Sequence, residues 1–195
     1  MTPAKRYHLL ATEGYFQKSL SPPKHKFRRS RSPYRCRILD EKLVDILAQI
    51  ELTVTPITDF KDYPFPELTV GIIEGGIGNQ EQLEIAHHLR ERSKILMAWG
   101  DCAVFGGINT LRNWIPKEEI LRRGYIETES TVNGVLPIHE ELPALLDKVR
   151  PVNEVVSVDV FVPGCPPSPE AIAYCLTEIL QGRLPVLPTD LIHFD

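Results

Sequence analysis

The chain has 195 residues, of which 43% are hydrophobic and 25% are charged. This composition is typical of a folded globular domain and excludes a collagen-like or wholly disordered chain. The length is enough to bury a core without disulfide staples. No apolar run approaches the roughly 18 residues of a membrane span, and the first ten residues have no signal-like apolar stretch. We therefore expect a cytoplasmic protein with no membrane span and with reduced thiols.

The formal net charge of −4 is unevenly distributed. No acidic residue lies between Glu13 and Asp40, whereas eight basic residues do, and removing these eight charges from −4 leaves −12 for the rest of the chain. Residues 13–37 also contain helix-breaking prolines. We predict a single domain over 1–195 that carries a basic loop at 13–37. The basic residues are Lys18, Lys24, Lys26, Arg28, Arg29, Arg31, Arg35 and Arg37.

Three interpretations of this basic loop remain open. Clustered Lys and Arg residues supply the electrostatic part of nucleic-acid binding, but this cluster has no helical spacing and the rest of the chain is strongly acidic. The loop is otherwise an arm that docks an acidic partner protein, or a solvated loop. We favour the partner arm and expect no nucleic-acid partner.

The first quarter of the chain predicts four segments in order. A short apolar run at 7–12 predicts a buried strand, and the basic loop follows it. Residues 40–50 place apolar side chains on one helical face, and residues 52–57 predict a strand near a sheet edge because of Pro56.

The middle of the chain has a clearer pattern. A continuous apolar run at 68–74 predicts a buried strand, and the turn at 75–78 leads to Asn79, which is suited to cap a helix that runs to about residue 92. A second buried strand is predicted at 94–100, with a turn at 101–107.

Short helices are then predicted at 108–113 and 117–123, and a further helix at 141–149.

The last part repeats the strand–turn–helix order. Residues 155–162 predict a strand, and prolines make the loop at 163–167 rigid. Ser168 and Pro169 are typical of a helix start, and this helix ends near Gly182. Repeated apolar strands separated by helices predict an α/β fold, a doubly wound parallel sheet with helices on both faces.

Three of the four cysteines follow predicted strands. Cys102 and Cys165 come directly after two buried strands, and Cys36 lies in the loop that leaves the first strand. Ligand sites of open parallel sheets lie at the carboxyl ends of the strands, and gathered thiolates suit an iron–sulfur cluster or, less often, zinc. The alternative is that these residues are small buried hydrophobes.

Neighbouring residues bear on this site. Gly164 beside Cys165 lets the backbone approach a bulky cofactor closely. Glu74, at a strand end, is a candidate to carry protons or to tune a cluster, and the alternative is a contact with solvent or a helix start. Cys175 belongs to an apolar stripe on the last helix, which predicts a role in the core.

The GGIG sequence at 75–78 is a weak match to a phosphate-binding loop, because it lacks the GxGxxG spacing. Simple turn geometry is the favoured interpretation. A cluster-free, flavodoxin-like binding module that uses this turn is kept as an alternative.

Three sequence motifs together resemble the small-subunit family of nickel–iron hydrogenases. They are IEGG at 73–76, GDCAVFGGI at 100–108 and VPGCPPSPEAI at 162–172. The resemblance covers residues 40–195 and is closest to the cytoplasmic NAD-reducing, or bidirectional, branch. The 20-kDa subunit of respiratory complex I shares PGCPP and the fold, but it carries an adjacent cysteine pair that this chain lacks.

The resemblance implies a flavodoxin-like domain that holds the proximal 4Fe–4S cluster. The partner large subunit would carry the nickel–iron centre and the active site, and the diaphorase subunits would carry FMN and NAD. The chain would then pass electrons within a hydrogen:NAD+ oxidoreductase. By motif, Cys102 and Cys165 would be cluster ligands, and Glu74 would lie near the cluster and the subunit interface. The alternative is the cluster subunit of another hydrogenase or of a complex I-like oxidoreductase.

The N-terminal part differs from the family pattern. The family has a C-x-x-C pair in a short loop after the first strand, whereas this chain has the basic loop with Cys36 alone. Cys36 is the candidate third ligand, and a cubane cluster takes four. A non-cysteine ligand such as His25, an altered cluster, or rearranged sequence between Glu13 and Arg37 would each account for the difference.

Overall fold

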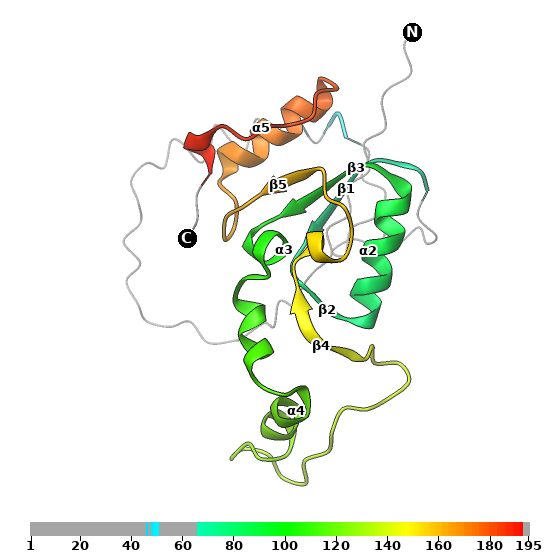
Figure 1. The fold of residues 1–195 in the computed structure, drawn as a ribbon, viewed down its shortest axis with the longest axis vertical. Helices are drawn as coiled ribbons and strands as arrows, with labels where there is room; N and C mark the ends of the chain where they lie inside the picture. The colour runs from blue at the N-terminus through cyan, green and yellow to red at the C-terminus, as the bar shows by residue number, and fades with distance from the viewer. Residues whose placement is uncertain (1–45, 47, 51–65, 193–195) are drawn as a thin grey trace.

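The computed structural model describes residues 46, 48–50 and 66–192, which form an α/β fold around a parallel sheet (Figure 1). The elements are β1 (Leu68–Glu74), β2 (Ile77–Asn79), α2 (Gln80–Arg92), β3 (Ser93–Trp99), α3 (Asp101–Phe105), the 3-10 helix η1 (Gly107–Trp114), α4 (Lys117–Tyr125), β4 (Leu145–Arg150), the 3-10 helix η2 (Val152–Glu154), β5 (Val160–Val162), α5 (Pro169–Leu180) and the 3-10 helix η3 (Thr189–Leu191).

Three strands pair in parallel, in the order β1-β3-β5. Their register brings the three carboxyl ends level, because Glu74 pairs with Trp99 and Trp99 pairs with Val162. The strand–helix–strand connections that join them place helices on the faces of the sheet. The segments that follow these strands therefore start side by side along one edge.

Each face of the sheet is covered by its own layer. Along β3, Leu96 and Ala98 face a core formed with α2 and α3, whereas Met97 and Trp99 face a core formed with α5. This alternation is the period of two expected of a strand that is buried on both sides. Figure 1 shows α2 and α5 on opposite sides of the sheet. The predicted fold class, a flavodoxin-like doubly wound parallel sheet with helices on both faces, is confirmed.

Two helices begin as their sequences predict. The side chain of Asn79 accepts a hydrogen bond from Gln82 N at 2.8 Å and so caps α2. Ser168 Oγ accepts from Ala171 N at 3.2 Å, with Pro169 in the first helical position of α5. Each cap satisfies a backbone donor that the helix itself leaves without an acceptor.

The helix predicted at 141–149 is wrong, because this region contains β4, which pairs antiparallel with β2. Its apolar spacing is helical, but its backbone groups bind other parts of the chain. Ala144 O accepts from Gln80 N at 2.9 Å, and Leu146 O accepts from Arg112 Nη2 at 2.9 Å. Val149 exchanges hydrogen bonds with the side chain of Asn113. These external partners favour the extended conformation over the helical one.

Three further boundaries differ from the sequence-based expectation. The predicted turn at 75–78 ends early, because β2 begins at Ile77. The predicted turn at 101–107 contains α3, which Gly100 and Gly106 flank with positive φ angles of 84° and 88°. The last strand is shorter than 155–162, because residues 155–159 form a turn and an irregular segment and β5 begins only at Val160.

Several predictions fall on residues that the structure does not describe. These are the strands at 7–12 and 52–57, the basic loop at 13–37 and most of the helix at 40–50. Ile46 is described as helical and is buried in the core beside α5. The single-domain assignment over 1–195 remains a prediction. In the part of the chain that the structure covers, no helix combines the length and the hydrophobicity that crossing a membrane requires.

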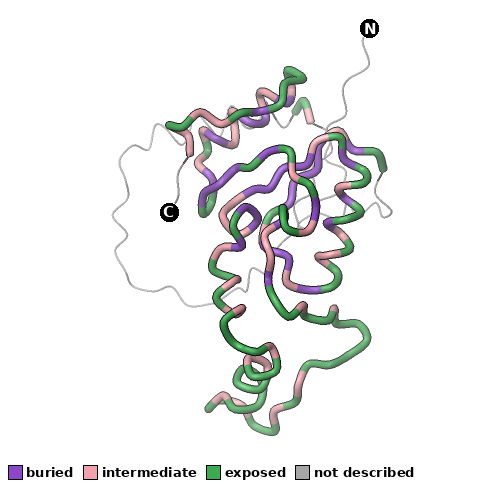
Figure 2. The backbone as a smooth tube through the Cα atoms, viewed as in Figure 1, coloured by how far each residue is buried: buried purple, intermediate pink, exposed green. Residues whose placement is uncertain are grey.

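One described segment, residues 107–148, contains no buried residue. It runs through η1, α4 and the loop into β4, and Figure 2 shows it without buried positions below the sheet. Arg112 and Asn113 tie this segment to the β2–β4 pair, since Arg112 Nη2 also donates to Gly78 O at 3.0 Å. Burial lowers the pKa of Arg112, and the nearby Asp147 carboxylate opposes this effect.

Candidate functional site

Two cysteines lie at the same offset beyond two neighbouring strands. Cys102 is the third residue after Trp99, where β3 ends, and Cys165 is the third residue after Val162, where β5 ends. Because Trp99 and Val162 pair in register, both loops leave the sheet side by side. The structure therefore brings Cys102 and Cys165 to the same edge, as the sequence predicts.

Backbone hydrogen bonds hold these two loops together beyond the strands. Gly100 N donates to Val162 O at 2.7 Å, and Asp101 N donates to Gly164 O at 3.0 Å. The side chain of Asp101 adds a third bond, because its Oδ1 accepts from Gly164 N at 2.7 Å. Asp101, directly before Cys102, is thus hydrogen-bonded to Gly164, directly before Cys165.

The surroundings of Cys102 leave room beside its sulfur. Cys102 is half-buried in the first turn of α3, and its carbonyl oxygen accepts from Gly106 N at 3.0 Å. Gly107 has a φ of 53°, and a Cβ atom there would stand 2.6 Å from Cys102 Sγ. A side chain at position 107 would collide with the thiol, so glycine keeps this space open.

Cys165 lies on an exposed part of a closely packed loop. Its side chain is exposed, whereas Gly164 before it and Pro167 after it are buried. Gly164 has a φ of 128°, and a Cβ atom there would stand 2.6 Å from Pro167 Cα. The Cys165–Pro166 peptide bond is cis. Glycine at position 164 is therefore required by the close packing of the loop, in addition to any approach of a cofactor.

The remaining predicted site residues divide into three cases. Glu74 ends β1 at the same edge and is exposed. Cys36 lies outside the described residues. Cys175 is fully buried in the α5 core, where desolvation, with a smaller contribution from Glu178, raises the pKa of its thiol to about 12. The prediction that Cys175 is a core residue agrees with this position.

The described residues alone do not form a complete metal site. Within 66–192 and the few described residues before them, no group of three or more His, Cys, Asp or Glu side chains is placed to hold a metal ion. The two thiols and the open space beside Cys102 fit one side of a 4Fe–4S cluster, whose natural ligands are cysteine thiolates. The remaining ligands would have to come from elsewhere in the chain.

Sequence reasoning did not identify Asp101 as part of this site. Its contact is with the backbone of Gly164, 63 positions later, and no local pattern reveals such a pairing. The one available signal is its place directly before Cys102 in a loop expected to face a second cysteine loop.

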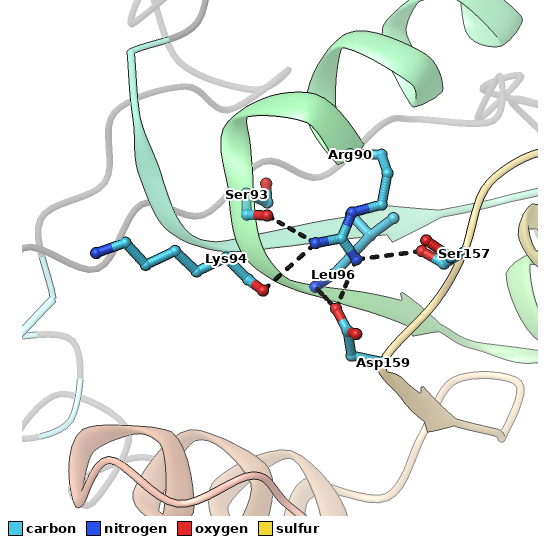
Figure 3. Close-up of polar contacts among 6 residues, drawn as sticks. All are labelled: Arg90, Ser93, Lys94, Leu96, Ser157 and Asp159. Atoms are coloured by element: carbon cyan, nitrogen blue, oxygen red, sulfur yellow. Dashed lines mark hydrogen bonds and ion pairs between the residues drawn. The ribbon is translucent and has the colours of Figure 1, made fainter.

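A second polar cluster lies at the opposite end of the sheet (Figure 3). Arg90, in the last turn of α2, donates to Asp159 Oδ2 at 2.6 Å, and it also donates to the backbone oxygens of Ser157, Ser93 and Lys94. Asp159 Oδ2 accepts from Leu96 N at 2.7 Å, and Asp159 N donates to Leu96 O at 2.9 Å. This cluster fixes the start of β5 against β3, so it helps to position the Cys165 loop.

A protein family and several curated proteins are similar in sequence to this chain. The family model described as NADH ubiquinone oxidoreductase, 20 Kd subunit, matches residues 34–179. The NAD-reducing hydrogenase HoxS subunit delta of Cupriavidus necator is 36% identical over 160 residues, which cover 80% of this chain and 76% of that protein. A vhu subunit of the F420-non-reducing hydrogenase of Methanocaldococcus jannaschii is 42% identical over 156 residues, 79% of this chain and 53% of that protein.

A solved hydrogenase structure is also similar to this chain. A crystal structure of an NAD+-reducing NiFe-hydrogenase in the H2-reduced state contains a chain that matches with a TM-score of 0.78 and 29% identity. The match covers 97% of this chain and 98% of that one. The chain spans only about half the length of the M. jannaschii relative. The curated relatives reported above are hydrogenase subunits. Together with the family match and the shared fold, they show that the chain belongs to the NADH:ubiquinone oxidoreductase 20-kDa subunit family.

Proposed function

We propose that the chain is the electron-transfer small subunit of an NAD-reducing nickel–iron hydrogenase. In this proposal Cys102 and Cys165 are two ligands of a proximal 4Fe–4S cluster, which when bound supplies a one-electron relay. The observation that carries the proposal is the equal offset of these two cysteines from neighbouring, level strand ends. The HoxS subunit delta relative and the matched NAD+-reducing hydrogenase support the NAD-reducing type.

The chain's own residues hold and shape this site. Two thiolates come from separate loops, so the rigid sheet edge sets the distance between them. Gly107 leaves space at one thiol, and Gly164 lets the second loop pack closely. Glu74, at the end of β1, places a carboxylate at the same edge, where it would tune the cluster and lie near the subunit interface. Its negative charge would stabilise the oxidised form of a nearby cluster.

We propose Cys36 as the third ligand, supplied from outside the described residues. The fourth ligand would come from the same loop, and His25 is the candidate there. This ligand set makes 13–37 part of the site as well as a basic arm for a partner.

The surface of residues 107–148 supports a role as one subunit of an assembly. This segment carries eleven exposed large apolar side chains and no buried one. A segment of this length without a core gains little hydrophobic free energy to offset its ordering. We propose that the hydrogenase large subunit, with its nickel–iron centre, covers it in the cytoplasm. FMN and NAD would be bound by the diaphorase subunits.

A second candidate is a related hydrogenase that uses another electron acceptor. The 42% identity to the vhu relative, which belongs to an F420-non-reducing hydrogenase, favours this alternative. In both cases the same edge of the sheet would hold the cluster, and only the acceptor module would differ.

The acceptor distinguishes the two candidates. The complex would be purified anaerobically with its co-expressed partner subunits, and hydrogen-dependent reduction of NAD+ would be compared with that of benzyl viologen. We expect reduction of both acceptors. Reduction of the viologen alone would reject the NAD-reducing type in favour of the related hydrogenase, and no hydrogen-dependent reduction of either acceptor would reject a hydrogenase.

A further inference from the structure

The two cysteine loops are linked by the side chain of Asp101. Its Oδ1 accepts a hydrogen bond from Gly164 N at 2.7 Å, while its own backbone N donates to Gly164 O at 3.0 Å. One residue thus satisfies both the donor and the acceptor of the peptide groups around Gly164. Asp101 directly precedes Cys102, and Gly164 directly precedes Cys165.

Gly164 requires such a partner. It is buried, so water does not readily replace an acceptor lost from its N–H. It also has a φ of 128°, a conformation outside regular strand or helix geometry, which sets the direction in which the chain enters Cys165. A charged acceptor makes a stronger hydrogen bond than a neutral one. The carboxylate therefore fixes the orientation of the Cys165 loop relative to α3.

We propose that Asp101 is a positioning residue for the cluster, which holds the Cys165 loop in register with Cys102 so that both thiols reach the same iron–sulfur core. The inference rests on the proposed function. It adds that the negative charge of Asp101, next to one ligand and bonded beside the other, lowers the reduction potential of the cluster. Charge and hydrogen bonding near a cluster are the means by which a protein sets its potential.

Two substitutions separate the hydrogen bond from the charge. Asp101→Ala removes both, whereas Asp101→Asn keeps an acceptor oxygen and removes only the charge. Asp190→Ala, at an exposed aspartate in η3, is the matched control. Each variant of the full chain would be co-expressed with its partner subunits and purified anaerobically. The measurements are iron per chain, the rate of iron loss to a chelator, and the midpoint potential from an EPR-monitored redox titration.

We expect Asp101→Ala to lose iron to the chelator roughly 10-fold faster than the wild type, in line with the loss of other residues that support metal ligands. Asp101→Asn should retain iron as the wild type does but titrate at a higher midpoint potential. Asp190→Ala should match the wild type in both measurements. If Asp101→Ala fails to fold, the raised potential of Asp101→Asn still tests the proposal, because a purely structural residue would leave the potential unchanged.

The outcomes separate this inference from the proposed function. With iron present in the wild-type complex, an unchanged potential in Asp101→Asn would overturn the effect of the Asp101 charge on the cluster and leave the cluster assignment intact. The positioning role is overturned if Asp101→Ala folds and holds its iron as firmly as the wild type. A wild-type complex with no iron beyond that of the partner subunits, and with no cluster EPR signal from this chain, would overturn the proposed function and the positioning role with it.

Discussion

Three cysteines of the described chain share one chemistry and differ in surroundings. Cys165 is exposed, Cys102 is half-buried, and Cys175 is fully buried among apolar side chains. The thiolate is the form that binds metals and reacts with electrophiles. Exposure therefore divides these residues into two that are accessible to a cluster and one that is not.

Alkylation of the metal-free full chain tests this division. At pH 8 iodoacetamide should modify Cys165 first and Cys102 more slowly, and it should leave Cys175 unmodified until the chain is denatured. The pKa of Cys175 is about 12, so only roughly one molecule in 10,000 carries its thiolate at pH 8. Peptide mass spectrometry over time gives the order. Early modification of Cys175 in the folded chain would contradict its place in the core.

At the residue scale, the sequence predicted where the three cysteines lie in the fold. It did not predict the hydrogen bonds that join the Cys102 and Cys165 loops. The i, i+3, i+4 and i+7 spacing around Cys175 identified a core residue, and the strand-end positions of Cys102 and Cys165 identified a shared edge. Asp101 was missed, because its partner is a backbone N–H of a distant loop. The ligands before residue 46 were not tested, since they lie outside the described residues.

At the scale of elements, the Arg90–Asp159 pair joins α2 to the start of β5 (Figure 3). Burial acts to raise the pKa of Asp159, but hydrogen bonds from Arg90 and Leu96 N outweigh it and lower the pKa. A carboxylate with a lowered pKa stabilises the fold at pH values above its unfolded-state pKa, and this contribution is lost as the pH falls through the folded-state pKa.

Asp159→Ala should therefore lower the free energy of unfolding at pH 7 by about 1–2 kcal/mol, the lower part of the range for hydrogen bonds to charged groups, because the pair is partly exposed. Urea unfolding of wild type and variant at a series of pH values measures the difference. It should be constant at neutral pH and shrink below about pH 4, the ordinary pKa of an aspartate. A difference that does not depend on pH would show that the charge of Asp159 contributes nothing.

Elements were predictable where local signals and packing agree. The strands β1 and β3 appear as continuous apolar runs, and α2 and α5 carry capping residues at their starts. The prediction failed at β4, whose apolar spacing is helical but whose carbonyl groups are bound by Arg112 and Asn113. It also missed α3, a helix of five residues, because so short a segment has no full period to detect.

At the scale of the whole molecule, most of the exposed apolar surface in the described chain gathers on residues 107–148. Trp114 is 87% exposed, and Leu111 lies on the same 3-10 helix, η1. The first residues of this segment directly follow α3, which carries Cys102. A partner that covers it would thus also approach the proposed cluster.

The double variant Leu111→Asp, Trp114→Asp should weaken association with the co-expressed large subunit. Exposed tryptophans at interfaces often cost roughly 2 kcal/mol or more of binding when removed, which is about a thirty-fold loss in affinity. Co-purification yield at fixed expression measures it. The control is Val186→Asp, which replaces an exposed apolar residue outside the segment. Equal yields for both variants would exclude this surface as the interface.

The central claim is that Cys102 and Cys165 hold an iron–sulfur cluster, and iron and sulfide analysis with EPR of the reduced complex tests it most directly. The complex would be purified anaerobically as the wild type and with Cys102→Ser, Cys165→Ser or Cys175→Ala in this chain. We predict that the cluster signal of this subunit is present in the wild type and in Cys175→Ala, and lost or altered in both serine variants, with NADH–dye activity retained. An unchanged signal in both serine variants, or a wild-type chain that binds flavin without iron or sulfide, would contradict the account.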